Sequence, residues 1–160
     1  MNKPKLSFKT KRLSIDELDN SSTQVHARLC ATMQPEVTTH LPNNFQGIKQ
    51  PKQACDWLNN LMQHSIVKGI YTEQLIGIVV LYPDKATLHL GYFLAKESWR
   101  KGYGSELIEG LIAHLRQSKK WRQLNAGVTS TNYASQSLLE KNGFKLQTKN
   151  QDMLSYTLEL

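Results

Sequence analysis

The sequence has few cysteines and no long apolar run, and each absence excludes a class of protein. Its two cysteines, Cys30 and Cys55, are too few for a disulfide framework, so we expect both thiols to be reduced. His26 and Cys30 have the spacing of one helix face, but two ligands do not make a zinc site, and we expect no metal. No run of about 18 apolar residues occurs, which excludes a membrane-spanning helix.

The N-terminal segment, MNKPKLSFKTKRL, is basic and lacks an apolar stretch. It does not fit a secretory signal, so we expect a cytoplasmic protein. The 160 residues contain no repeat and no linker, which indicates one domain over residues 1–160, large enough to bury its own core. The net charge is +7, which fits a nucleic-acid binder, a protein with an anionic ligand or an ordinary basic protein.

Hydrophobic periodicity predicts a mixed α/β chain. Apolar residues repeat every four positions in the expected helices, and β-branched and aromatic residues fill the expected strands. The middle of the chain reads as an antiparallel meander. The expected elements are a strand within 10–18, a helix within 19–33, a loop over 34–50, a helix from Pro51, strands over 66–71, 74–82 and 85–95, a helix from Tyr103, a strand over 122–129, a helix within 132–143 and two strands within 144–160.

The segment SWRKGYGSELIEGL places Gly102 and Gly104 just before an apolar helical repeat. It lacks the spacing and the lysine of a P-loop, and Leu107 stands where a dinucleotide fingerprint needs a third small residue. Exposed N–H groups at a helix start form an anion site, and Arg100 and Lys101 add positive charge that favours a diphosphate. The alternative is a flexible turn without a ligand.

A second segment, TNYASQSLLEKNGF, follows a predicted strand and reads N-x-x-S-x-x-L-L-E-K-x-G-F. Paired with W-R-K-G-Y-G-S-E, it resembles the GNAT superfamily of acyl-CoA-dependent N-acetyltransferases. TKRLSIDEL and LIGIVVLYPDKATLHLGYFL are similar to the branch of ribosomal-protein N-terminal acetyltransferases, and the resemblance covers residues 10–148. It implies a single-domain GNAT-like fold of the α+β type, with a mixed, mostly antiparallel twisted sheet flanked by helices. The fourth and fifth strands would splay apart, with acetyl-CoA between them.

The resemblance also implies a set of cofactor-binding residues. The family's loop motif usually begins with glutamine or arginine, whereas Trp99 stands there and Arg100 lies one place on. That departure weakens the role expected of Arg100 but leaves the backbone N–H groups in place. The implied contacts are Phe93 and Leu94 with the acetyl-pantetheine arm, Arg100, Lys101, Gly102, Tyr103, Gly104 and Ser105 with the diphosphate, Asn132 with the pantetheine, and Ser135 with the region of the thioester sulfur.

Acetyl transfer needs a neutral amine and a proton for the leaving thiolate. His89 is the candidate base, because strand alternation puts it on the face expected to look toward the cofactor and its ordinary pKa is about 6.5. The alternative is a sheet histidine bonded to a neighbour. Ser135 is the candidate acid, one helical turn after Asn132; the alternative is a serine that satisfies the helix start. Tyr133 and Tyr156 could also donate the proton.

The expected function is therefore acetyl-CoA-dependent transfer to a primary amine, either a protein N-terminus or a small molecule. The loop that would face the acceptor holds Glu36 as its only acid, with His40 nearby, which disfavours a polyamine. A non-catalytic acyl-CoA-binding sensor is the alternative, and an RNA-associated module is supported only by the charge. Exposed sheet edges near the C-terminus suggest a homodimer.

Overall fold

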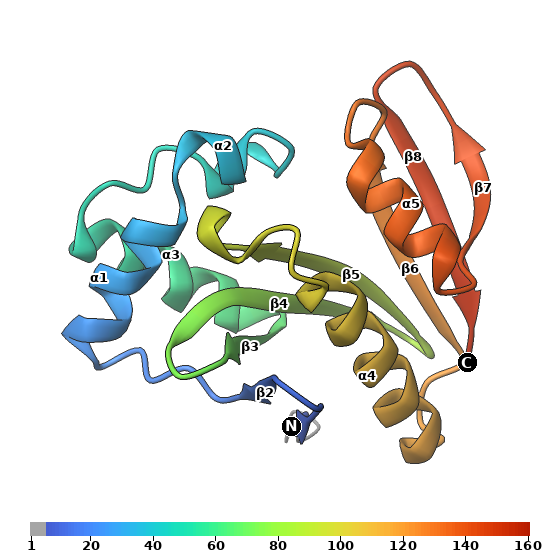
Figure 1. Ribbon diagram of the computed structural model, residues 1–160, viewed down its shortest axis with the longest axis horizontal. Helices are drawn as coiled ribbons and strands as arrows, with labels where there is room; N and C mark the ends of the chain where they lie inside the picture. The colour runs from blue at the N-terminus through green and yellow to red at the C-terminus, as the bar shows by residue number, and fades with distance from the viewer. Residues whose placement is uncertain (1–5) are drawn as a thin grey trace.

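The computed structural model describes residues 6–160 and contains one eight-stranded sheet, in the order β1-β2-β3-β4-β5-β6-β8-β7 (Figure 1). The N-terminal segment that does not fit a secretory signal begins with residues 1–5, which lie outside the described residues. The elements are β1 (Phe8–Lys9), β2 (Ser14–Asp16), α1 (Thr23–Thr32), α2 (Pro35–Thr38), the 3-10 helix η1 (Asn43–Phe45), α3 (Pro51–His64), β3 (Ile66–Tyr71), β4 (Leu75–Asp84), β5 (Thr87–Leu94), the 3-10 helix η2 (Lys96–Ser98), α4 (Tyr103–Ser118), β6 (Gln123–Thr129), α5 (Tyr133–Lys141), β7 (Lys145–Lys149) and β8 (Met153–Glu159).

The predicted order of helices and strands is confirmed. The structure adds short elements that the sequence did not predict, among them β1, α2 and η1. Strand β1 has only two residues, too few for an alternating pattern. Helix α2 and the 3-10 turn η1 lie inside the segment 34–50, which we expected to be a loop. Pro35 begins α2, because its fixed φ suits the first helical position. The prolines of the segment 34–50 are also the reason that the sequence predicted a loop there.

Helix ends follow the local sequence. The Ser22 side chain accepts a hydrogen bond from the Val25 N–H at the start of α1, and Pro51 opens α3. Gly143 has φ +93° just after α5, a left-handed conformation that glycine adopts without steric cost. These caps fix where the helices begin and stop.

Both cysteines carry free thiols, as the sequence predicted. Cys30 lies on α1 and Cys55 on α3, and both are half-buried. The His26 Nε2 lies 2.8 Å from the Asn20 Oδ1, and residues 6–160 contain no group of three or more side chains that could hold a metal ion. Within residues 6–160, each helix is too short or too polar to span a bilayer.

The sheet has a hydrophobic core on each face. One core packs α4 and α5 on the sheet through residues such as Leu107, Leu111 and Leu139. The other packs α1 and α3 on the opposite face through residues such as Leu29 and Leu58. Helix burial of this kind supplies most of the helical stability, and it leaves the functional segments at one end of the sheet.

Strands β5 and β6 separate part-way along their length. They pair in parallel from Thr87 opposite Gln123 to Leu90 opposite Ala126, whereas β5 runs on to Leu94 and β6 continues past Ala126. In Figure 1 the two strands converge near the C-terminus and diverge away from it. The expected splay of the fourth and fifth strands is therefore present, and it falls between β5 and β6 because β1 precedes the strand that we counted as the first.

Candidate active site

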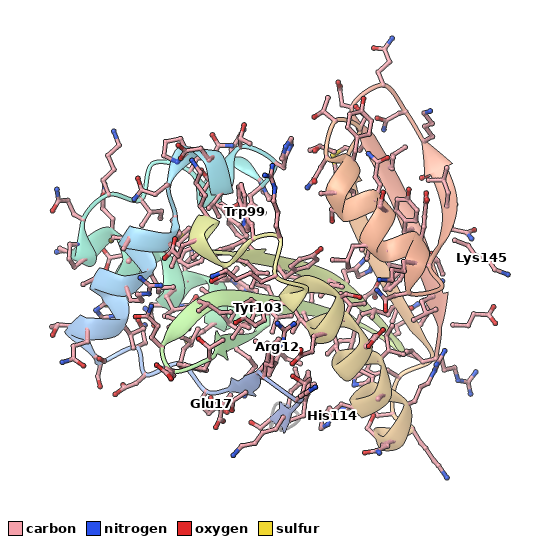
Figure 2. The ribbon with its side chains drawn as sticks, in the orientation of Figure 1. Arg12, Glu17, Trp99, Tyr103, His114 and Lys145 are labelled. Carbon is pink, nitrogen blue, oxygen red and sulfur yellow. The ribbon has the colours of Figure 1, made fainter. Side chains whose placement is uncertain are left out.

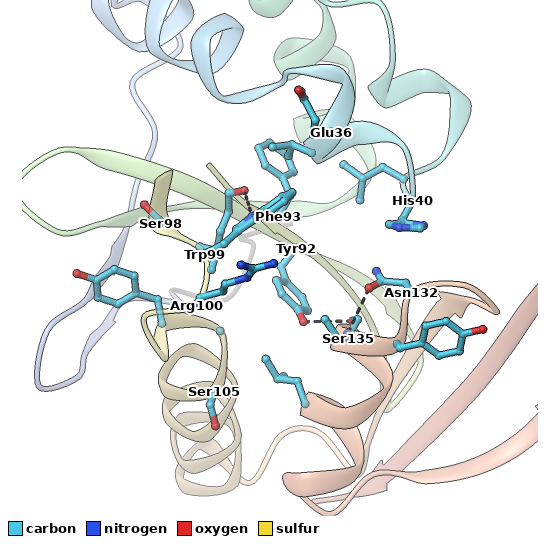
Figure 3. A pocket seen from close by; sticks show the side chains of 18 of the residues that line it. Glu36, His40, Tyr92, Phe93, Ser98, Trp99, Arg100, Ser105, Asn132 and Ser135 are labelled. Atoms are coloured by element: carbon cyan, nitrogen blue, oxygen red, sulfur yellow. Dashed lines mark hydrogen bonds between the residues drawn. The ribbon is translucent and has the colours of Figure 1, made fainter. Parts of the chain in front are cut away.

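A cavity of about 660 Å³ lies where β5 and β6 separate (Figure 3). One wall comes from residues 36–41, in and after α2, which we call the α2 segment. The other walls come from the end of β5, the loop before α4 and the start of α5. Apolar and polar side chains both line it, as in most small-molecule sites. The lining residues are Glu36, Val37, His40, Leu41, Tyr92, Phe93, Leu94, Ser98, Trp99, Arg100, Gly102, Tyr103, Gly104, Ser105, Thr131, Asn132, Tyr133, Ala134, Ser135 and Leu138.

Every cofactor-binding residue implied by the sequence lines this cavity, with the exception of Lys101. The backbone carbonyl of Lys101 instead accepts a hydrogen bond of 2.8 Å from Arg12 Nη1. The Trp99 indole also belongs to the cavity wall, and its Nε1–H donates to the Leu94 carbonyl at 2.8 Å. Segments that are far apart in the sequence therefore meet around one space.

His89 does not line the cavity. It is exposed and lies opposite Tyr82 on β4 and Asn125 on β6, in the part of β5 that still pairs with β6. The side chains of β5 alternate as expected, because Leu90 packs in the first core and Phe93 in the second. The position along the strand is what differs: the gap opens only after Leu90. His89 is therefore an exposed histidine of the sheet, outside the cavity.

The loop before α4 leaves backbone N–H groups at the cavity wall. Arg100 has φ +61° and Gly102 φ +82°, and a left-handed conformation costs about 1–2 kcal/mol for a residue with a side chain. Within residues 6–160, no side chain caps the start of α4, whereas Asn132 Oδ1 accepts from the Ser135 N–H at the start of α5. The first N–H groups of a helix carry partial positive charge, so this loop can hold an anion.

Gly104 serves packing. A Cβ at Gly104 would lie 2.7 Å from Leu138 Cδ1, so its hydrogen side chain lets the start of α4 lie against α5. The structure gives Gly102 the left-handed turn and Gly104 the contact between the two helices.

Arg12, between β1 and β2, holds this loop from outside the cavity. Its Nε–H donates to Glu106 Oε1 at 2.8 Å, its backbone N–H donates to Glu106 Oε2 at 2.7 Å, and the Thr10 hydroxyl also donates to Glu106. The guanidinium lies 4.4 Å from the centre of the Tyr103 ring; Figure 2 shows both residues near the start of α4. Although desolvation opposes ionisation, these hydrogen bonds lower the pKa of Glu106 to about 2. No local pattern in the sequence marks a contact between residues so far apart.

Two hydroxyl groups meet beside the gap. The Tyr92 hydroxyl lies 3.2 Å from Ser135 Oγ (Figure 3), and burial raises the pKa of the Tyr92 phenol above its ordinary value. Tyr156 is engaged elsewhere: burial and its hydrogen bond to Glu140 raise its pKa to about 12. Tyr133 lines the cavity but is 71% exposed. Sequence reasoning proposed the other two tyrosines and missed Tyr92.

The opposite wall comes from the α2 segment. His40 Nδ1 lies 2.9 Å from the Thr129 Oγ1, so the segment after α2 is joined to the end of β6 across the separation of the strands. Glu36 is the one acid among the lining residues that the structure describes, and its carboxylate lies 3.6 Å from Lys96 Nζ. This wall is therefore weakly charged.

The family model of the acetyltransferase (GNAT) domain matches residues 12–145. The chain belongs to the GNAT acetyltransferase family. Among curated proteins, no sequence matches this chain significantly, so its relatives are seen through structure.

Three solved structures illustrate the likeness of this GNAT acetyltransferase to other members. RimL, a ribosomal L7/L12 α-N-protein acetyltransferase in complex with coenzyme A, has 14% identity and a TM-score of 0.83, with 94% of this chain and 96% of that chain covered. A GNAT acetyltransferase from Bacillus anthracis has 18% identity and a TM-score of 0.80, with 96% and 98% covered. The microcin C7 self-immunity acetyltransferase MccE, in complex with acetyl-CoA and AMP, has 14% identity and a TM-score of 0.77, with 94% and 93% covered. At these identities the likeness shows the fold.

Proposed function

We propose that this GNAT acetyltransferase moves the acetyl group of acetyl-CoA to a primary amine, by direct attack of the amine on the thioester. The observation that carries the proposal is the cavity at the separation of β5 and β6, which joins the loop before α4 to a weakly charged second wall. Both substrates of such a transfer can therefore reach one point from opposite sides. The neighbours RimL and MccE were solved with coenzyme A and acetyl-CoA, which supports the donor.

The donor would lie along the wall formed by β5, α4 and α5. The N–H groups of the loop 100–105 and of the first turn of α4 would receive the diphosphate. The pantetheine arm would run beside β5 from Gly91 to Leu94, the stretch past the end of the register with β6. A backbone N–H on this stretch would stabilise the oxyanion that forms on the acetyl carbonyl.

The acceptor would enter from the α2 side. A polyamine site needs several carboxylates, whereas this wall holds Glu36 alone, already paired with Lys96. A peptide N-terminus or a small amine of low charge fits better, because an α-amino group with a pKa of about 8 is partly neutral at physiological pH. RimL is described as an α-N-protein acetyltransferase, which agrees with that class of acceptor.

The chemistry needs two proton transfers. The neutral amine nitrogen attacks the carbonyl carbon, the carbon–sulfur bond of the resulting tetrahedral intermediate breaks, and the nitrogen loses a proton while the thiolate sulfur gains one. His40 is the imidazole of the cavity and would accept the proton from the amine, directly or through water. Ser135 and Tyr92 are the hydroxyls that would protonate the sulfur.

The proposed function is tested by measuring donor binding and acetyl transfer with the same preparation. Isothermal titration should detect binding of acetyl-CoA and coenzyme A, and a thiol-release assay should detect turnover with some members of a panel of N-terminal peptides and small amines. Mass spectrometry of the product should place the acetyl group on the amine. Binding without turnover on any acceptor would favour the acyl-CoA-binding sensor, and absence of binding would overturn both proposals.

The two histidines named above give a matched test of the base. His40→Gln should lower kcat/KM for the acceptor on the order of tenfold or more, since removing a general base commonly costs at least that much. His89→Gln should leave kcat/KM and its pH profile within about twofold of the wild type, in line with the small effect of most surface substitutions. The reverse pattern would restore His89 as the base and exclude His40.

A further inference from the structure

The start of α4 has an electrostatic conflict that the chain must resolve. The N–H groups of the first turn are the proposed diphosphate site, yet Glu106, in that same turn, carries a negative charge. An unpaired carboxylate there would repel a diphosphate at short range. Arg12 and Thr10 bind both carboxylate oxygens of Glu106, and Glu106 does not line the cavity. The charge of Glu106 is thus turned toward the segment between β1 and β2 and balanced there.

The same arginine reaches the backbone of the loop. Arg12 Nη1 donates to the Lys101 carbonyl at 2.8 Å, next to Gly102 with its φ of +82°. Nη2 lies close to Gly102, because a Cβ added there would come within 3.2 Å of it. The guanidinium also covers the Tyr103 ring at 4.4 Å. One side chain therefore contacts the loop before the helix, the first residue of the helix and the acid of its first turn.

The attachment of this segment to α4 extends beyond Arg12. The Phe8 ring of β1 stacks on His114 of α4, with 5.2 Å between the ring centres. In Figure 2 Arg12 lies beside the start of α4, and His114 lies further along that helix. Arg12 is thus presented by a segment that is anchored independently, so a change at Arg12 need not detach the segment.

We propose that Arg12 and Glu106 are a positioning pair for the donor: Arg12 fixes the conformation of the loop 100–102 and neutralises Glu106, so that the loop N–H groups bind the diphosphate of the coenzyme. This inference rests on the proposed function, because it takes the donor to be acetyl-CoA. Neither residue touches the reacting atoms. Their effect is on binding of the diphosphate part of the donor and leaves the acetyl-transfer step unchanged.

The experiment compares acetyl-CoA with S-acetyl-pantetheine, which carries the same thioester but no diphosphate. In Arg12→Ala, the KM for acetyl-CoA and the Kd for coenzyme A should rise on the order of tenfold, the usual scale for losing a charged hydrogen-bonding partner. The kcat with acetyl-CoA and the kcat/KM with S-acetyl-pantetheine should stay within about twofold. Arg12→Lys keeps the charge but cannot bond to Glu106 and Lys101 together, so it should show part of the same loss.

A second substitution separates the effect of the unbalanced Glu106 charge from the effect of losing the Arg12 contacts with the loop. In the double variant Arg12→Ala/Glu106→Gln the unbalanced carboxylate is gone, so coenzyme A should bind more tightly than in Arg12→Ala alone. Arg116→Ala is the matched control, since Arg116 lies in the last turn of α4 and donates to the Glu159 carbonyl; it should bind coenzyme A like the wild type. Thermal melting of each variant checks folding, and Arg12→Lys carries the test if Arg12→Ala does not fold.

The outcomes separate this inference from the proposed function. Equal losses with both donors would mean that Arg12 supports only the fold, and the inference would be wrong while the function stands. Unchanged coenzyme A binding in Arg12→Ala and Arg12→Lys would have the same meaning. A wild-type protein that does not bind coenzyme A would overturn the proposed function and the inference together.

Discussion

Removing the hydroxyl of either Tyr92 or Ser135 should lower kcat for acetyl transfer on the order of 100-fold, with little change in the KM for acetyl-CoA. The thiolate that leaves acetyl-CoA resembles a cysteine with a pKa of about 8.5, so its departure at neutral pH is helped by a proton donor. Tyr92 and Ser135 lie 3.2 Å apart, and burial raises the pKa of Tyr92, which keeps its proton on the phenol. The measurement is steady-state kinetics of Tyr92→Phe and Ser135→Ala.

The double variant shows whether the two hydroxyls act together. If they form one relay to the sulfur, Tyr92→Phe/Ser135→Ala should lose no more than the worse single variant, because residues that act as a unit are not additive. Tyr133→Phe is the control: Tyr133 also lines the cavity but is 71% exposed, and its kcat should stay within about twofold. Normal kcat in both single variants would exclude this pair as the proton source.

Local sequence patterns predicted the helices and strands that span at least one full period of the pattern. The strand predicted over residues 66–71 appears with those bounds as β3, since its β-branched and aromatic residues are typical of a strand. The helix from Tyr103 follows from its four-residue repeat. Two-residue β1 and four-residue α2 were missed, because neither spans a full period of its pattern. The splay of β5 from β6 came from the family resemblance, since periodicity carries no information on where two strands part.

The candidate site divides in the same way. Motifs on one continuous stretch line the cavity as a group: the loop 100–105, with the exception of Lys101, and the start of α5. Contacts between distant segments could not be predicted: Arg12 with Glu106, and His40 with Thr129, join residues that no local pattern relates. His89 shows a subtler limit. Alternation gives the face of a strand but not how far along it the neighbouring strand departs.

The wall that Phe93 and Leu94 give to the cavity depends on a close approach of β4. Gly77 lies opposite Leu94, and a Cβ at Gly77 would stand 2.1 Å from the Phe93 carbonyl oxygen and 3.1 Å from the Leu94 Cα. Backbone atoms cannot turn aside as a side chain can. A methyl group at this point must therefore push the end of β5 away from β4, toward the gap where the donor is proposed to lie.

Gly77→Ala should consequently impair stability and donor binding together. Overpacking of this kind costs about 1–3 kcal/mol, which lowers the Tm of a chain of this size by roughly 2–12 °C. The KM for acetyl-CoA should rise because Phe93 and Leu94 move. Gly127→Ala is the matched control on a strand outside the cavity lining, since a Cβ there meets only the Met153 Cε, at an ordinary contact distance of 3.5 Å; it should keep both values. Calorimetry and donor kinetics measure the two effects. A Gly77→Ala protein with wild-type Tm and KM would mean that β5 can shift without disturbing the cavity, and that the position of its end does not determine donor binding.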